Sequence, residues 1–235
     1  SSVNDPDNPV IPYIKGNIAA AHGRFEEAKE FYTDTLLKQP THVRARINRA
    51  SVNMALEEPQ EALDDCHHLL CEAPELHLAV VRRSEALMML AQWSEAKEGW
   101  EKVLDFNPNH SHALMQLAAC HMALEHPELA ETPLNDALRI DPSNAAAWHQ
   151  RGLLYLEWGR EEAALADFEK AAKADEKHLD ARLHIAAIHH EANRWNEGRD
   201  AWRDALSIDP ENTVARRRFE ESDLKIVAEE ALKNA

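Results

Sequence analysis

The feature that most constrains this chain is a proline that returns every 34 residues. Prolines stand 34, 34, 34 and 68 residues apart, at Pro40, Pro74, Pro108, Pro142 and Pro210. Glu176 occupies the one place in this series that lacks proline. A fixed period of this length is typical of repeat architectures, in which short units stack in a row. Counting back from each proline divides the chain into six units: 9–42, 43–76, 77–110, 111–144, 145–178 and 179–212.

Two columns of these units hold small residues, and a third usually holds a large one. The eighth position reads Gly16, Ala50, Ser84, Ala118, Gly152 and Ala186. The twentieth position reads Ala28, Ala62, Ala96, Ala130, Ala164 and Gly198. The twenty-fourth position reads Tyr32, Cys66, Trp100, Leu134, Phe168 and Trp202. Small side chains let two helices approach closely, and a large neighbour fills the space beside the contact. Each unit is therefore predicted to be two helices joined by a short turn and ended by a proline-containing turn.

Composition supports helices and excludes several functional classes. The 235 residues include only 6 glycines and are rich in the helix formers Ala, Leu, Glu and Arg. With 26 Lys and Arg against 42 Asp and Glu, the net charge is −16, which repels nucleic acid and anionic membranes. No apolar run approaches the roughly 20 residues that span a bilayer, so no membrane insertion is expected. The 3 cysteines are too few for a disulfide framework and favour a cytoplasmic, reducing location.

The columns resemble those of the tetratricopeptide repeat. The fifth unit is the best match and places six residues on the family's signature positions: Trp148, Gly152, Tyr155, Ala164, Phe168 and Ala171. The resemblance covers residues 9–212. It implies an all-α, right-handed superhelical solenoid of helix-turn-helix repeats, with the first helix of each repeat lining an inner groove. Residues 1–8 are expected to be a disordered segment, and residues 213–235 a capping helix over the last repeat.

Prolines outside the periodic series predict two local departures. The dipeptide Thr132-Pro133 falls well inside the second helix of the fourth unit, where proline removes a hydrogen bond, so a kink or a broken hydrogen bond is predicted. Pro12 lies near the start of the first helix, which is expected to begin late or irregularly.

The stretch CHHLLCEAPELH at residues 66–77 looks at first like a metal site. Cys66, however, falls in the large core column, and it lies about 140° from Cys71 around a helix, so the two thiols cannot share one face. A set that could still hold zinc weakly is Asp64, His67 or His68, and Cys71, along one outer stripe. The alternative is that these are solvated polar residues on an outer helix face. No cofactor is expected.

Other histidines are expected to pack or to face the groove, and none completes a catalytic motif. His121 and His189 share a column with Tyr155 and are predicted to be packed rings, whereas His184 and His190 are predicted to face the groove. The chain has no glycine-rich phosphate loop, no HExxH motif and no recognisable pairing of nucleophile and base. It is therefore not expected to be an enzyme, and a catalytic or zinc-binding role is kept as a remote alternative.

The family resemblance implies which side chains line the groove. The fifth and twelfth positions form an apolar stripe that includes Tyr13, Ile47, Met54, Val81, Met88, Met115, Met122, His149 and Leu156. Polar groups are added by Asn17, Asn48, Arg82 and Gln116. Flexible methionines suit a surface that adapts to a partner helix or an extended peptide. The main expectation is therefore a non-catalytic scaffold that binds a protein or peptide in the concave groove; the alternative is that the stripe packs against neighbouring helices.

A sharper alternative comes from co-chaperone members of the family, which hold the C-terminal carboxylate of heat-shock chaperones with a clamp of Lys, Asn, Asn, Lys and Arg. Here KGN at 15–17 supplies Asn17, INRAS at 47–51 supplies Asn48, and VRRSEAL at 81–87 supplies Arg82. The two clamp lysines fall on Tyr13 and Leu78. Two missing ammonium groups remove most of the positive field, so the resemblance implies at most a partial clamp.

Overall fold

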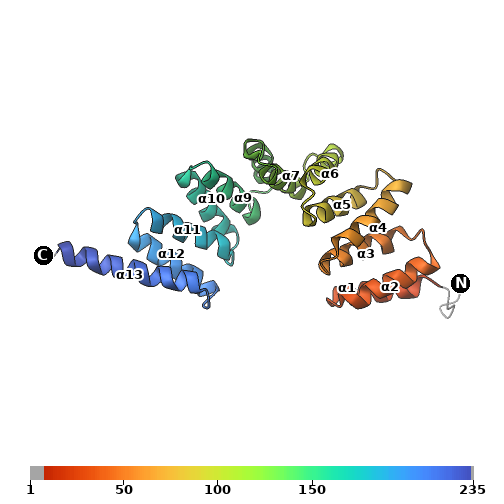
Figure 1. Ribbon diagram of the computed structural model, residues 1–235, viewed down its shortest axis with the longest axis horizontal. Helices are drawn as coiled ribbons and strands as arrows, with labels where there is room; N and C mark the ends of the chain where they lie inside the picture. Colours follow the sequence, from red (N-terminus) through yellow and green to blue (C-terminus); the bar gives the residue numbers. More distant parts are fainter. Residues whose placement is uncertain (1–7, 234–235) are drawn as a thin grey trace. The chain divides into compact units, whose positions relative to one another are not determined.

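The computed structural model describes residues 8–233, and every regular element in that range is helical. In chain order (Figure 1) the elements are α1 (Val10–Ala21), α2 (Phe25–Lys38), α3 (Val43–Ala55), α4 (Pro59–Glu72), α5 (His77–Met89), α6 (Trp93–Phe106), α7 (Ser111–Ala123), the 3₁₀ turn η1 (Pro127–Leu129), α8 (Glu131–Ile140), α9 (Ala145–Glu157), α10 (Glu161–Ala174), α11 (Leu179–Glu191), α12 (Trp195–Ile208) and α13 (Thr213–Lys233). The all-α class is confirmed. Apart from residue 8, the segment expected to be disordered lies outside the described residues.

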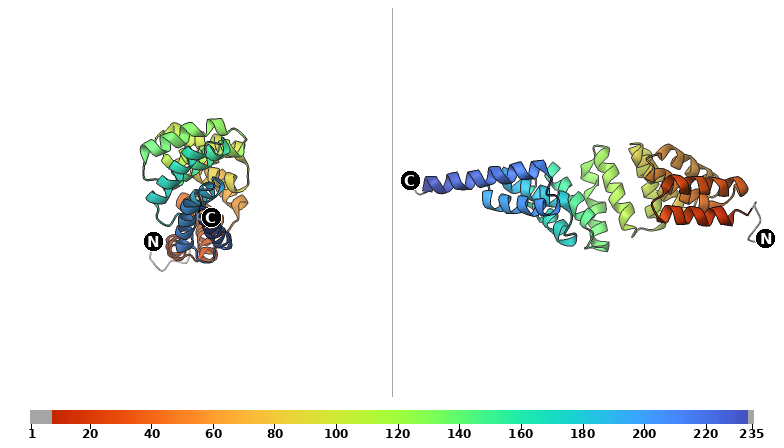
Figure 2. Two further views of the ribbon diagram at one scale, coloured as in Figure 1. Left: turned by 90° about the vertical axis from the view of Figure 1, so that its left-hand side faces the viewer. Right: turned by 90° about the horizontal axis from the view of Figure 1, so that it is seen from below.

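The described residues fall into two compact units, one ending at Glu125 and the other beginning at His126. In the first unit α1 packs on α2, α3 on α4 and α5 on α6, and each pair contacts the next helix along the chain. In the second unit α9 packs on α10 and α11 on α12, and α13 lies against α12 in the place expected of a capping helix. Figure 2 shows these hairpins from two further sides. Each unit is thus a stack of helical hairpins, while the division into six repeats at the predicted boundaries stays a prediction.

The close contact between small and large columns is confirmed inside the hairpins. A Cβ atom added to Gly16 would lie 2.6 Å from the ring of Tyr32, and one added to Gly152 would lie 2.7 Å from the ring of Phe168. Real atoms do not approach so closely, so the ring occupies the space that the glycine leaves. Trp100, at the same position of the third hairpin, is completely buried.

The turn inside each hairpin uses one left-handed residue. Among the described residues, positive φ angles between 55° and 71° occur at Gly23, Glu57, Ala91, Glu125, Gly159 and Asn193, again 34 residues apart. The next backbone N–H then closes the helix end: that of Arg24 donates to the carbonyl of Ala19, and that of Gln92 to the carbonyl of Leu87. Gly23 and Gly159 adopt this conformation without steric cost. Elsewhere the turn holds side-chain-bearing residues in a conformation that disfavours them.

Junctions between hairpins are held by side chains whose role the sequence analysis missed. The residue just before a first helix caps it by accepting a backbone N–H, through Nδ1 of His42, His110 and His178 and through Oδ1 of Asn144 and Asn212. The fourth residue of the helix then donates a side-chain hydrogen bond to the backbone carbonyl of the residue six positions before it. Such bonds run from Arg46 to Pro40, from Trp148 to Pro142, from Arg182 to Glu176 and from Arg216 to Pro210.

The predicted break at Thr132-Pro133 takes the form of a helix that starts late. Residues 127–129 form the 3₁₀ turn η1, and α8 begins only at Glu131. Pro133 therefore lies in the first turn, where its missing N–H has no helical partner to lose. Pro12 likewise lies in the first turn of α1, which begins at Val10, one position later than the equivalent helices.

Substituting Ala91→Gly is expected to raise the free energy of unfolding by about 0.5–1 kcal/mol, because glycine adopts the left-handed conformation at φ 55° without strain. Urea unfolding followed by circular dichroism measures the change. The matched control is Ala166→Gly, an exposed site in the middle of α10, where the same substitution should lower stability by about 1 kcal/mol. A loss of stability in both variants would contradict the expectation.

Candidate functional site

We call the surface carried by the first helices of the hairpins the inner face: α1, α3, α5 and α7 in the first unit, and α9 and α11 in the second. All thirteen groove residues predicted from the sequence lie on these helices. None of them is fully exposed. Tyr13, Met54, Val81, Met88, Met122, His149 and Leu156 are half-buried, as are the polar Asn17, Asn48, Arg82 and Gln116. The apolar stripe is thus partly used for packing between helices, as the alternative expected.

Two members of the predicted stripe belong to the core. Ile47 is only 8% exposed and packs with Leu69 and Ala79, and Met115 is 7% exposed. Met88 has an internal role as well, because Nε1 of the buried Trp100 donates to its Sδ at 3.1 Å. The inner face therefore offers a partner less apolar area than the column pattern suggested.

The structure brings the two predicted asparagines together. Oδ1 of Asn17 on α1 accepts hydrogen bonds from the Tyr32 hydroxyl and from Nδ2 of Asn48 on α3, both at 2.9 Å. Burial raises the pKa of Tyr32, although its contact with Asn48 works in the opposite direction, so the phenol remains a donor. These bonds fix the Asn17 amide and leave its Nδ2 without a partner among the described residues. That group can donate to a carbonyl or carboxylate of a ligand.

The arginine of the predicted clamp is held inside the protein. Nη1 of Arg82 donates to Oε2 of Glu85 at 2.6 Å, and Nε2 of His112 lies 3.6 Å from the other oxygen of that carboxylate. Burial favours a higher pKa for Glu85, but the bonds from His112 and Arg82 outweigh it and lower the pKa below its usual value. Glu85 is therefore ionised and neutralises Arg82. Leu78 and Tyr13 occupy the lysine positions, so the clamp has no uncompensated cation.

A histidine cluster that the sequence analysis missed lies on the second unit's inner face. The ring of His149 on α9 lies 4.8 Å from that of His178 and 5.4 Å from that of His184, and His184 stacks on Phe168 at 4.7 Å. Burial lowers the pKa of His149 to about 4, and the two neighbouring histidines contribute in the same direction. Burial also lowers the pKa of His184. His149 and His184 are thus held neutral near pH 7. The signal was present in the sequence, since position five of one repeat lies near the last position of the same repeat and near position six of the next.

His190 corrects another expectation. It was expected to face the groove, but it is 7% exposed and its Nδ1 lies 3.2 Å from the hydroxyl of Ser222 on α13. The residue fixes the capping helix rather than lining the inner face. His121 and His189 are half-buried, as expected of packed rings.

The four candidate zinc ligands on the outer stripe of α4 are not placed to hold a metal ion together. Asp64, His67, His68 and Cys71 are all exposed, and the described chain contains no group of three or more His, Cys, Asp or Glu placed to hold a metal ion. Burial raises the pKa of Cys66 to about 12, so its thiol is not a thiolate ligand at neutral pH.

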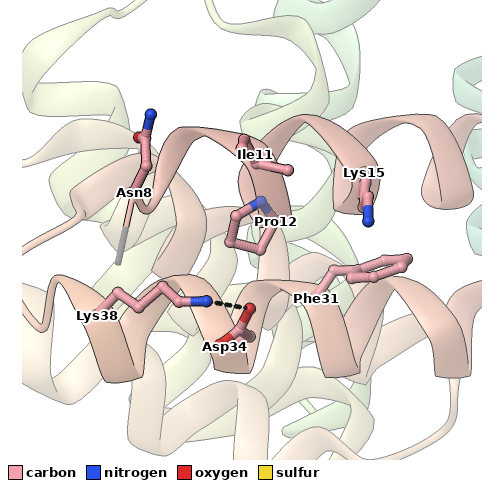
Figure 3. A pocket seen from close by; sticks show the side chains of 7 residues that line it. All are labelled: Asn8, Ile11, Pro12, Lys15, Phe31, Asp34 and Lys38. Carbon is pink, nitrogen blue, oxygen red and sulfur yellow. Dashed lines mark hydrogen bonds and ion pairs between the residues drawn. The ribbon is translucent and has the colours of Figure 1, made fainter. Parts of the chain in front are cut away.

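A hollow with a volume of about 220 Å³ lies beside α1 and α2. Figure 3 shows the side chains that line it. Its two lysines have partners within the chain. Nζ of Lys38 lies 2.8 Å from Oδ2 of Asp34, and Nζ of Lys15 lies over the ring of Phe31 at 5.6 Å (Figure 3). In this hollow Lys38 is therefore paired with a carboxylate, whereas Lys15 contacts an aromatic ring.

The second unit is expected to lose stability as the pH falls from about 6.5 toward 4. His149 has a folded-state pKa below its unfolded value, so the unfolded chain binds the proton first, and the stability present above pH 6.5 is lost in that window. Because the ring is only half-buried, the loss is expected to be about 1–2 kcal/mol. Urea unfolding at several pH values measures it. His149→Leu, which copies Leu183 at the equivalent position, should flatten the profile; an unchanged slope would exclude His149 as its origin.

Comparison with known proteins agrees with the hairpin architecture. Residues 13–67 and residues 145–178 each match a model of the tetratricopeptide repeat. RNA polymerase II-associated protein 3 of Mus musculus is 28% identical over 124 residues, which are 53% of this chain and 19% of that protein. The heat shock protein sti1 homolog of Schizosaccharomyces pombe is 33% identical over 86 residues, which are 37% of this chain and 15% of that protein. The chain thus spans less than a fifth of the length of these relatives.

A solved structure supports the same architecture. A tetratricopeptide repeat protein from Parabacteroides merdae superposes with a TM-score of 0.73 over 93% of this chain and 86% of its own, at 23% identity. None of the helices described here has both the length and the hydropathy to cross a membrane. Residues 13–67 and 145–178 thus match the tetratricopeptide repeat, and the buried small-to-large contacts and stacked hairpins of the described chain agree with the fold of that repeat protein.

Proposed function

We propose that this tetratricopeptide-repeat scaffold is non-catalytic and binds a partner peptide or helix on the inner face of its first unit. The observation that supports this most is the bonded set of Asn17, Tyr32 and Asn48, which joins α1, α2 and α3. It holds an amide donor in place before any ligand arrives, and preorganised donors lower the entropic cost of binding. Half-buried Tyr13, Met54 and Val81 lie on the same helices and add apolar contact.

The magnitudes favour a moderate affinity. A hydrogen bond to the Asn17 amide contributes about 0.5–1.5 kcal/mol net, and apolar burial adds about 25 cal/mol per Å². Because the apolar side chains are already half-buried and Ile47 and Met115 lie in the core, the added area is small. A dissociation constant on the order of micromolar is expected, as suits a reversible scaffold.

A second candidate function is the binding of a heat-shock chaperone tail through its C-terminal carboxylate. Similarity to the sti1 homolog, whose name identifies it as a heat shock protein, and the paired Asn17 and Asn48 favour it. The ion pair between Arg82 and Glu85 argues against it, since a carboxylate ligand would have to compete with an internal one. We therefore place this function second.

The proposal also covers chemistry and location. The histidines of the inner face lie beside aromatic rings and other histidines, with no nucleophile among the contacts described. A scaffold role therefore accounts for these residues better than catalysis or zinc binding does. Cys66, Cys71 and Cys120 are free thiols, which suits a cytoplasmic location.

Replacing Leu78 and Met122 on the inner face by Glu should reduce the recovery of partner proteins at least tenfold, because two charges would face the bound peptide. Tagged protein is incubated with lysate, and the captured proteins are quantified by mass spectrometry. The matched control is Leu37→Glu on α2, a leucine that is 77% exposed and lies outside the inner face. Equal recovery by both variants would move binding to another surface.

An acidic pentapeptide ending in a free carboxylate and its amidated twin should bind within threefold of each other, because Glu85 already neutralises Arg82. Fluorescence anisotropy of the labelled peptides measures both affinities. Glu85→Gln releases Arg82 and is expected to increase the preference for the free acid at least fivefold. A tenfold or greater preference in the unmodified protein would instead favour the chaperone-tail function.

A further inference from the structure

Four of the hairpins carry a cation at the seventh position of the 34-residue unit, and three of these cations contact the residue sixteen positions later. Lys15 lies over the ring of Phe31 at 5.6 Å. Arg49 donates to both carboxylate oxygens of Asp65, at 2.9 and 2.7 Å, and Arg151 does the same to Asp167, at 2.7 and 2.9 Å. The fourth cation, Arg83, has Gly99 at that place. It lacks the partner that the others have.

The two complete pairs show how fully such an arginine is normally neutralised. Asp65 and Asp167 are 3% and 2% exposed. A third contact comes from the preceding hairpin, where Nη1 of Arg49 donates to Thr33 and Nη1 of Arg151 to Asn135. Fork-shaped pairing with a carboxylate is the preferred geometry of a guanidinium group. In these hairpins the arginine is therefore satisfied from inside the protein.

The third hairpin does not supply the missing carboxylate, because residue 99 is glycine. A Cβ atom added to Gly99 would lie 2.1 Å from Oγ of Ser84, so a side chain there would displace the Ser84 hydroxyl from its hydrogen bond to the carbonyl of Val80. In the second hairpin, where the aspartate does fit, the residue equivalent to Ser84 is Ala50. Arg83 makes no hydrogen bond or ion pair with any described residue, and the same holds for Lys102 on α6.

Both cations line one hollow between α4, α5 and α6. Its volume is about 340 Å³, and its lining consists of His67, Leu70, Cys71, Pro74, Val80, Arg83 and Lys102. None of these residues is acidic, although the whole chain has a net charge of −16. Leu70, Pro74 and Val80 provide an apolar wall beside the two charges. A ligand that carries an anionic group next to an apolar group would match these two cations and this apolar wall.

We propose that this hollow binds an oxyanion carried by a peptide, either a phosphorylated side chain or a glutamate or aspartate, with an adjacent apolar residue against Leu70, Pro74 and Val80. The oxyanion takes the place that Asp65 and Asp167 fill in the complete hairpins. Arg83 offers the forked contact and Lys102 a second positive charge. The site lies on second helices as well as α5, so it is separate from the inner face.

Peptide binding tests the proposal directly. The probes are an acetylated, amidated heptapeptide with leucine next to phosphoserine and its twins with glutamate or alanine in place of phosphoserine, measured by titration calorimetry. The phosphoserine or the glutamate peptide should bind saturably, and the alanine twin at least tenfold more weakly. The ratio of the first two affinities identifies which oxyanion the site takes. Alanine and charged peptides binding equally would overturn the proposal.

Charge removal has a matched control on the same helix. Arg83→Met and Lys102→Met should each weaken binding of the charged peptide at least tenfold. Lys97→Met should not, because Lys97 is already paired with Glu101 at 3.2 Å. Equal weakening by all three would show that only the general charge of the protein matters and would overturn the proposal.

A carboxylate of the protein itself can also be placed in the site by substitution. The double variant Ser84→Ala, Gly99→Asp copies the Ala50 and Asp65 pair of the second hairpin and supplies Arg83 with an internal carboxylate. This variant should unfold at a higher temperature than the unmodified protein and lose binding of the charged peptide. Unchanged binding in a variant whose unfolding temperature rises would overturn the proposal.

A readout on the unmodified protein serves if a variant fails to fold. Cys71 is exposed and lines the hollow, whereas Cys66 and Cys120 are buried. Saturating charged peptide should therefore slow the reaction of Cys71 with N-ethylmaleimide at least fivefold, and the alanine twin should leave it unchanged. An unchanged rate with the charged peptide would place its binding elsewhere and overturn the proposal.

Discussion

The structure depends on a close contact between two helices at a residue with almost no side chain. Where Gly16 meets Tyr32, and where Gly152 meets Phe168, a single added carbon would overlap the ring. The ring fills the space that the glycine leaves. Because the glycine has no Cβ atom, the two helices of such a hairpin can lie at this short distance. Because a hairpin buries only one side of itself, it needs the next hairpin to cover the other. Stacking follows from that need.

Much of this fold could be predicted from the sequence, because a period is visible without knowing any contact. The small and large columns and the break near Pro133 depend on position in the unit, and position is what the period gives. The period does not show how deeply each side chain is buried. Ile47 and Met115 share a column with half-buried Tyr13 and Val81, yet they lie in the core, because the neighbouring hairpin covers each member of a column to a different extent.

In the candidate site, too, some features could be predicted from position in the repeat and others could not. The pairing of Asn17 with Asn48 could be anticipated, since both fall on adjacent inner helices. The capture of Arg82 by Glu85 was readable from their spacing of three residues on one helix, but the choice between an internal and an external partner is a matter of side-chain geometry. Arg83 was hidden for a different reason. It lacks the carboxylate that Asp65 and Asp167 supply in other hairpins, and this difference becomes visible only when the hairpins are compared in three dimensions.

The residues that cap the first helices differ in chemistry, and this has a consequence for the joints of the array. Asn144 and Asn212 offer an amide oxygen, which accepts a hydrogen bond at any pH. His42, His110 and His178 accept through a ring nitrogen that must carry no proton. Every second junction is thus capped by a ring nitrogen, and the junctions between them are capped by an asparagine or, at Leu76, by no side chain.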